Sequence, residues 1–445
     1  MAIDSNYIFE IAKAACASAI KNGAEFADVS VGAGKCLSVE IESCKLKSTD
    51  SQIGSSISVR AIYKGGTGWS SSEKLDIEDA AESGKKAAEL SKISEPDPDF
   101  ISLPSPVKSY EQLLGMYDKE LESMSLAELI NYCHQNILAG LKVRSDAILS
   151  GGFGVSTNKS VFVNSLGIQL EKQSSRIEGS ISAIVKEGKA VGSFYDFDFS
   201  RNLSGFNPTG ISEKAVKDAI RYLGAKPIAT AKMPVVFGPL ASMSILGGIT
   251  SNLDAESVLR GRSFMAGMVG TKIASDLLTI TDDPLIPGGL SSRFTDSEGF
   301  PCKPLVLIKD GILNTFLYGS YTAGKAKAAN TGHGSRGASA SASNVIPKLG
   351  NKTAEEIISE VEEGIYINAG GLSPNPITGD VSASVDFGFK IENGKLAYPI
   401  SSTIIGGNFI EMLRNIDAIS SDYRSLPGLI LPTIRIQNIM AAGAG

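Results

Sequence analysis

The chain has 445 residues, of which 42% are hydrophobic and 20% are charged, and its formal net charge is −6. This composition is typical of a folded globular protein and excludes a disordered chain. Nucleic-acid binding relies on Lys and Arg side chains that neutralise phosphates, so the acidic balance and the absence of a basic stripe exclude that class of partner. No apolar run approaches the roughly 18 residues that span a bilayer, and we expect no membrane association.

The N-terminus and the cysteines favour a cytoplasmic location. The first residues read as an amphipathic helix, and they carry Asp4 and Glu10 where a secretory signal would carry positive charge. The cysteines number five, which is odd, and no two of them are spaced as CxxC. We therefore expect reduced thiols in a cytoplasmic protein.

The first predicted domain, residues 1–105, combines helices and strands. Residues 24–70 alternate apolar and polar side chains at period two, which predicts short strands, and residues 77–93 predict a helix. Residues 94–107 contain Pro96, Pro98, Pro104 and Pro106. Such a density of proline excludes a helix and predicts a linker at this boundary.

The second predicted domain, residues 106–228, begins with a capping box at Ser125 and Glu128 before a helix with an apolar stripe. Residues 146–198 predict an antiparallel meander, with breaks expected at 158–159, 166–167 and 187–188. A helix over 212–223 closes the domain.

The third predicted domain, residues 229–445, is rich in strands. A strand at 233–237 precedes a helix opened by Gly238 and Pro239. Further elements are expected as a strand over 277–280, hairpins turning at 310–311 and 393–394, helices after Thr353 and over 408–416, and a closing strand over 429–436. The chain as a whole is expected to be α+β, with N-terminal α/β units that contain an antiparallel meander and a strand-rich C-terminal domain.

The chain contains only two histidines, His134 and His333. Most zinc sites and acid–base sites use histidine, so the chain has few ways to build one. His134 lies beside the apolar stripe of its helix, and we expect it to be partly buried with a local hydrogen bond. His333 lies in a Gly- and Ser-rich stretch that we expect to be a flexible polar loop.

Carboxylates in the third domain leave two interpretations open. Asp282 and Asp283 precede Pro284, which is a turn signature, whereas Asp296 and Glu298 could face one side of an extended segment as an acid–base pair. The turn interpretation is favoured. A metal site built from these carboxylates with His333 and Cys302 is the less favoured alternative. Residues 335–343 are rich in serine but have no adjacent base, and no phosphate-binding glycine motif is present.

Several segments of the third domain, in their order and spacing, resemble the TldD/PmbA family, also called peptidase U62 or modulator of DNA gyrase. The resemblance covers essentially the whole chain. The segments are residues 261–275, 281–284, 296–301, 310–313, 330–336 and 364–371.

One arm of that family, the TldD arm, carries an HExxxH helix and a later cysteine that bind zinc. The corresponding helix here, residues 238–249, contains no His, Glu, Asp or Cys, and residues 420–435 contain no Cys. Serine, methionine and glycine cannot replace imidazole in a zinc site. The pattern resembles the metal-free PmbA arm, also called TldE, which implies no catalytic residue and no metal ligand on this chain.

The resemblance implies a subunit of a cytoplasmic zinc metallopeptidase complex that degrades unfolded peptides, with zinc held by a TldD-like partner that carries HExxxH. We expect the peptide to add as a strand to an exposed sheet edge. In isolation the chain is expected to form a homodimer. The alternatives are a homo-oligomeric peptide-binding scaffold and a metallopeptidase with a relocated metal site. The predicted substrate or partner contacts are Asn330, Thr331, Gly332, His333, Gly334, Arg336, Asp283, Asp296 and Glu298.

Overall fold

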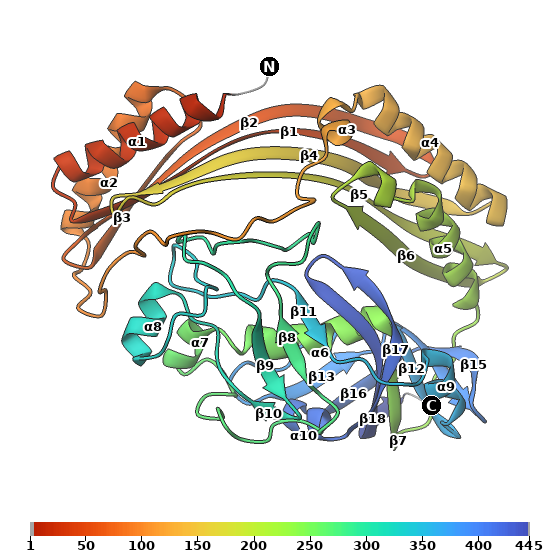
Figure 1. Cartoon of the computed structure of the whole chain (residues 1–445). Coiled ribbons are helices and arrows are strands. Elements are labelled where there is room, and N and C mark those ends of the chain that lie inside the picture. The colour runs from red at the N-terminus through yellow and green to blue at the C-terminus, as the bar shows by residue number, and fades with distance from the viewer. Residues whose placement is uncertain (1–3, 444–445) are drawn as a thin grey trace.

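Two β-sheets with flanking helices make up the computed structural model, which describes residues 4–443. A long, twisted first sheet arches over a second, strand-rich unit (Figure 1). The helices of the first sheet cover its outer face, and the second unit lies against its inner face. The α+β class predicted from the sequence is confirmed. No helix in the described part of the chain is long and apolar enough to cross a membrane.

The first sheet has six strands in the order β3-β2-β1-β4-β5-β6, and all neighbours are antiparallel. Because β1 pairs with β4, the first two predicted domains share one sheet, and the boundary at residue 105 remains a prediction. The strands are β1 Phe26–Glu42, β2 Lys45–Tyr63, β3 Gly66–Ser72, β4 Ile148–Asn164, β5 Gln169–Glu187 and β6 Ala190–Ser200.

The strands are longer than the sequence predicts. The break expected at Asn158 and Lys159 is wrong, since both residues lie within β4 and pair with β1 and β5. Strand neighbours on both sides outweigh the weak strand propensity of these residues. The turns at 166–167 and 187–188 are confirmed, and Gly167 and Gly188 adopt φ values of +101° and +58° there.

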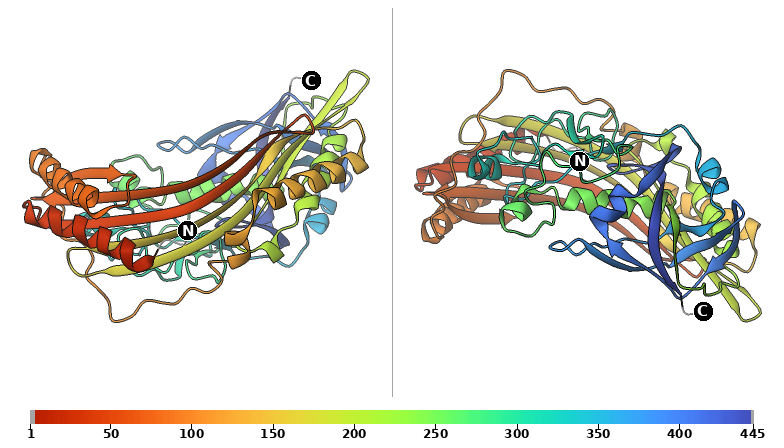
Figure 2. Two further views of the ribbon diagram at one scale, coloured as in Figure 1. Left: turned by 90° about the horizontal axis from the view of Figure 1, so that it is seen from above. Right: turned by 90° about the horizontal axis from the view of Figure 1, so that it is seen from below.

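Helices cover the two ends of the arch (Figures 1 and 2). α1 Ser5–Lys21 and α2 Ile77–Ile93 lie over one end, while α3 Lys119–Ser123, α4 Leu126–Val143 and α5 Pro208–Arg221 lie over the other. The capping box at Ser125 and Glu128 is confirmed. The expected partial burial of His134 is wrong, because it lies on the exposed side of α4 next to the buried stripe. The predicted linker, residues 94–107, contains no helix or strand.

The second sheet has 12 strands, with a central path β10-β9-β8-β11-β18-β7-β12-β14-β15 and with β13, β16 and β17 attached through β18. The strands are β7 Ala231–Phe237, β8 Ile280–Asp282, β9 Leu305–Lys309, β10 Ile312–Leu313, β11 Val345–Pro347, β12 Glu363–Ala369, β13 Asp380–Ser384, β14 Phe387–Glu392, β15 Lys395–Ile400, β16 Thr403–Asn408, β17 Ile416–Leu426 and β18 Leu429–Gly443. The helices are α6 Pro239–Ser251, α7 Ala255–Leu259, α8 Ser320–Ala326, α9 Ala354–Ser359 and α10 Phe409–Arg414.

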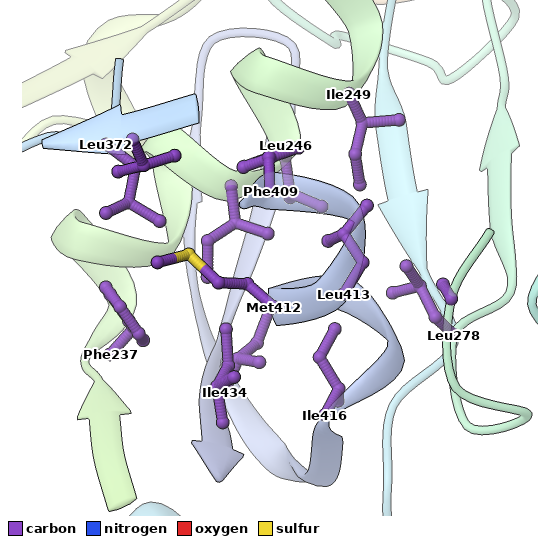
Figure 3. Close-up of a cluster of buried hydrophobic side chains, with 14 of the residues drawn as sticks. Phe237, Leu246, Ile249, Leu278, Leu372, Phe409, Met412, Leu413, Ile416 and Ile434 are labelled. Atoms are coloured by element: carbon purple, nitrogen blue, oxygen red, sulfur yellow. The ribbon is translucent and has the colours of Figure 1, made fainter. Parts of the chain in front are cut away.

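The core of the second unit lies around α6 and α10. Leu246 and Ile249 of α6 pack with Phe409 and Leu413 of α10 (Figure 3). Gly248 gives α10 room to approach, because a Cβ at this position would lie 2.7 Å from the Phe409 ring. Side-chain packing therefore fixes α6 in the interior of the unit.

Candidate functional site

Four of the nine predicted contact residues, Asp296, Glu298, Gly334 and Arg336, lie where the second unit meets the inner face of the first sheet. Residues 294–301 and 330–344 of the second unit reach β1 and β2 there, through side chains separated by hundreds of residues in the sequence. We call this region the junction and define it by Asp28, Arg60, Glu298 and Arg336.

Asp28 lies at the centre of the junction and is fully buried. Arg60 Nε donates to its Oδ2 over 2.8 Å, and Arg336 Nε donates to its Oδ1 over 2.6 Å. Arg336 also donates to the carbonyl oxygen of Ser58 over 3.0 Å. One carboxylate of the first sheet thus binds one guanidinium from each unit.

Two carboxylates of the second unit complete the network. Glu298 Oε1 lies 3.3 Å from Arg60 Nη2, and its Oε2 accepts the N–H of Ser320 over 2.8 Å. Asp296 accepts the N–H groups of Phe300 and Gly334 over 2.9 and 3.0 Å. Burial, together with the charge of Glu298, raises the pKa of Asp296 to about 7.

Trp69 of β3 covers the two guanidinium groups. Its ring centroid lies 4.9 Å from the Arg336 guanidinium and 5.9 Å from that of Arg60. Such contacts stabilise cations over an aromatic face. The ring is 42% exposed and borders a cavity of about 240 Å³ that Arg336 also lines.

His333 is buried, and the expectation of a flexible polar loop is wrong. Its Nε2 lies 2.9 Å from Asp282 Oδ2, and its Nδ1 lies 3.0 Å from Thr331 Oγ1. Ser343 donates both its N–H and its hydroxyl to Asp282, each over 2.6 Å. The small residues of this stretch allow tight folding in which buried polar groups find partners.

The remaining predicted residues make local contacts. Asp283 accepts the N–H of Leu285 over 2.9 Å, which agrees with the turn interpretation and leaves it outside the junction. Asn330 accepts the N–H of Gly332, and the Gly332 carbonyl accepts the Cys302 thiol. A Cβ on Gly334 would lie 2.7 Å from the Cα of Gly319, so only glycine fits there.

Sequence reasoning missed Asp28, Arg60 and Trp69. The available signal was weak: Asp28 and Arg60 stand among apolar residues in predicted strands, and Trp69 is the only tryptophan. Nothing in a single sequence pairs β1 and β2 with a loop near residue 336.

The donor groups on α6 do not fit zinc. Ser242 and Ser244 donate their hydroxyls to the carbonyls of Pro239 and Ala241 in the same helix, over 2.9 and 2.7 Å. Leu246 and Ile249 are fully buried in the core. Within residues 4–443, no three His, Cys, Asp or Glu side chains converge in a way that could hold a metal ion.

Comparisons with protein families match almost the whole chain. Residues 27–90 match PmbA/TldA metallopeptidase domain 1, residues 119–223 match the central domain, and residues 230–443 match the C-terminal domain.

Individual relatives and structures agree. The chain is 26% identical to a metalloprotease of Methanocaldococcus jannaschii over 90% of each chain. It is 25% identical to the metalloprotease PmbA of Escherichia coli O157:H7, over 94% of this chain and 92% of the relative. The crystal structure of TldE from Thermococcus kodakarensis superposes with a TM-score of 0.90 at 25% identity, covering 97% of this chain and all of that one. The order of domains, the sheet architecture and these matches together show that the chain belongs to the TldD/PmbA metallopeptidase family.

Proposed function

We propose that this chain is the metal-free subunit of a cytoplasmic zinc metallopeptidase complex that degrades unfolded peptides. A TldD-like partner with an HExxxH helix supplies the zinc and the general base. The single observation that carries the proposal is the side-chain content of α6, the helix that corresponds to the zinc-binding helix of the TldD arm.

Two properties of α6 support this assignment. Its serine hydroxyls are bound to the backbone of their own helix, and its largest side chains fill the core (Figure 3). In zinc-dependent peptide hydrolysis, the metal ion lowers the pKa of a bound water. The ion is held by nitrogen, sulfur or carboxylate ligands. A partner is therefore required for that chemistry.

An exposed apolar surface supports association with another chain. Ile404 of β16 and Met440 of β18 lie diagonally opposite on neighbouring strands and on the same face, and they are 47% and 40% exposed. The opposite face carries Ile405 and Ala441, which are buried in the core. Exposed apolar side chains on adjacent strands are typical of an interaction surface. We place the contact with the partner, or with a second copy in isolation, on this face.

In the proposed complex, the junction fixes the positions of the two units relative to each other. Residues 330–336 hold the first sheet against the second unit, so that both present a fixed surface to the partner and the peptide. Among the predicted contact residues, Arg336 also borders the cavity beside Trp69, and we retain it as a candidate peptide contact.

The test is cleavage of a disordered peptide by this chain, by its HExxxH partner, and by the two together. We expect zinc-dependent cleavage by the pair and none by this chain alone. A partner whose HExxxH glutamate is replaced by glutamine is the control and should abolish cleavage. Chelator-sensitive cleavage by this chain alone would contradict the proposal, and a pair with no activity would favour the scaffold alternative.

A further inference from the structure

A cavity of about 760 Å³ lies apart from the Trp69 cavity, between the edge of β5, residues 110–117 and residues 292–294. Its volume lies within the ~300–1,000 Å³ of ordinary ligand sites. We call it the β5 groove.

One wall of the β5 groove is an open sheet edge. β6 pairs with β5 only from Ile177 to Glu187, so within the described chain residues 169–176 have β4 as their one strand neighbour. Ser175 shows which way this edge points: its N–H donates to Met116 over 3.0 Å, and its carbonyl accepts from Arg201 over 3.1 Å. In an antiparallel strand the N–H and C=O of one residue point to the same side, and alternate residues share that side. The backbone groups of Gln173 and Glu171 therefore face the groove.

Three cations line the same groove, namely Lys172, Arg201 and Arg293. Their hydrogen-bond acceptors are backbone carbonyls rather than carboxylates. Lys172 Nζ lies 3.4 Å from the Thr295 carbonyl, Arg201 donates to the Leu290 carbonyl over 2.6 Å, and Arg293 donates to the Ser341 carbonyl. The three side chains are half-buried, and the charge of Asp296 acts on Lys172 without a carboxylate hydrogen bond to it. A bound carboxylate would lower the cost of holding these cations partly out of water.

Two further observations support the binding of an anion in this groove. The Nε atoms of Arg201 and Arg293 are buried and have no hydrogen-bond partner among residues 4–443, and the same holds for the Thr295 hydroxyl. Burial lowers the pKa of Lys172, and burial with the nearby Arg176 lowers the pKa of Arg201.

The carboxylates that line the groove do not neutralise these cations. Glu171 accepts the Ser5 hydroxyl of α1 over 2.6 Å and the Gln173 amide over 3.0 Å, which directs it to the helix-covered face. Glu111 is exposed on the covering segment.

We propose that the β5 groove binds an extended peptide segment that carries carboxylate side chains. The peptide pairs with the outward backbone groups of Glu171 and Gln173, and its carboxylates bind Lys172, Arg201 and Arg293. The inference deepens the proposed function, on which it rests for the class of ligand, because it names acidic unfolded segments as the preferred substrates.

The test is fluorescence anisotropy of the full chain with a short fluorescein-labelled peptide of alternating Thr and Glu, compared with its Gln-for-Glu counterpart. We expect the Glu peptide to bind about tenfold more tightly, since charge-assisted hydrogen bonds are the stronger kind. Lys172→Gln should weaken Glu-peptide binding about tenfold and should leave binding of the Gln peptide almost unchanged. Lys309→Gln removes an exposed Lys outside the groove and should change neither affinity.

A second variant tests the sheet edge. Gln173→Pro removes one outward N–H and no hydrogen bond to β4, which an edge strand tolerates. We expect weaker binding of both peptides with an unchanged melting temperature. Equal affinity for the two peptides, no binding to the wild-type chain, or full binding to Lys172→Gln would overturn the inference.

The subunit role fails by a different result. If the peptide binds in the groove but the reconstituted pair does not cleave it, the subunit role is contradicted and the peptide-binding groove is supported. If the pair cleaves the peptide but the groove does not bind it, the subunit role is supported and the peptide-binding groove is contradicted.

Discussion

The junction and α6 differ in the kind of side chain that they bury. At the junction, Asp28, Arg60, Glu298 and Arg336 are largely buried and pair with one another across two units. In α6, the helix on which the proposed function depends, the buried residues are apolar apart from Ser242. The charge network forms only when both units are packed against each other, because each unit supplies part of it. The packing of α6 depends only on the core of the second unit. The comparison separates what holds this chain together from the chemistry that, in the proposed function, a partner supplies.

The largest expected effect is at Asp28. Asp28→Ala leaves two buried guanidinium groups without their shared carboxylate, and we expect a loss of about 3–5 kcal/mol in the free energy of unfolding. Urea unfolding followed by circular dichroism measures it. Glu40→Ala breaks an exposed pair with Lys47 and is the matched control, with no measurable change expected. Equal effects of the two variants would show that the junction does not stabilise the fold.

Leu246→Ala tests the apolar side of the comparison. Leu246 is fully buried in the core around α6, and its truncation should cost about 2–5 kcal/mol in the free energy of unfolding. Met243→Ala, on the 40% exposed side of the same helix, should have a much smaller effect. Similar losses in both variants would mean that α6 is not packed as described.

The pKa of Asp296 makes the junction sensitive to pH. Folding raises this pKa from 3.8 to about 7, so the folded chain binds the proton more tightly than the unfolded chain does. The resulting stabilisation is fully present below about pH 4 and is lost as the pH rises towards 7. Relative to Asp296→Asn, the wild-type chain should therefore lose a few kcal/mol of unfolding free energy over that range. Parallel pH profiles of the two proteins would contradict the raised pKa.

Ile404→Glu should have the smallest effect on stability and a clear effect on association. The side chain is exposed, so the melting temperature should be nearly unchanged. Sedimentation with the HExxxH partner should show about tenfold weaker binding or more, because a charge is placed in an apolar contact. Unchanged association would exclude this face as the interface.

The sequence predicted the α+β class, most helices and the hairpins, because capping residues, proline and period-two alternation act locally. The capping box at Ser125 and the turn at Gly188 are examples. It could not predict that β4 continues through Asn158, since the neighbouring strands decide this.

At the junction, the sequence predicted residues of the second unit but none of the first sheet. The family motifs indicate Arg336 and Glu298, but their partners Asp28 and Arg60 lie hundreds of residues away. The burial of His333 could not be predicted from the sequence either, because small polar residues are typical of both mobile loops and tightly folded polar interiors. Sheet pairing and domain contact determine these features, and neither leaves a local pattern.

The most direct test of the central claim is the zinc content of the purified chain and of the reconstituted pair, measured by mass spectrometry after dialysis. We predict that the chain alone retains no stoichiometric zinc and that the pair retains the zinc of the partner. Stoichiometric zinc held by this chain alone would contradict the account.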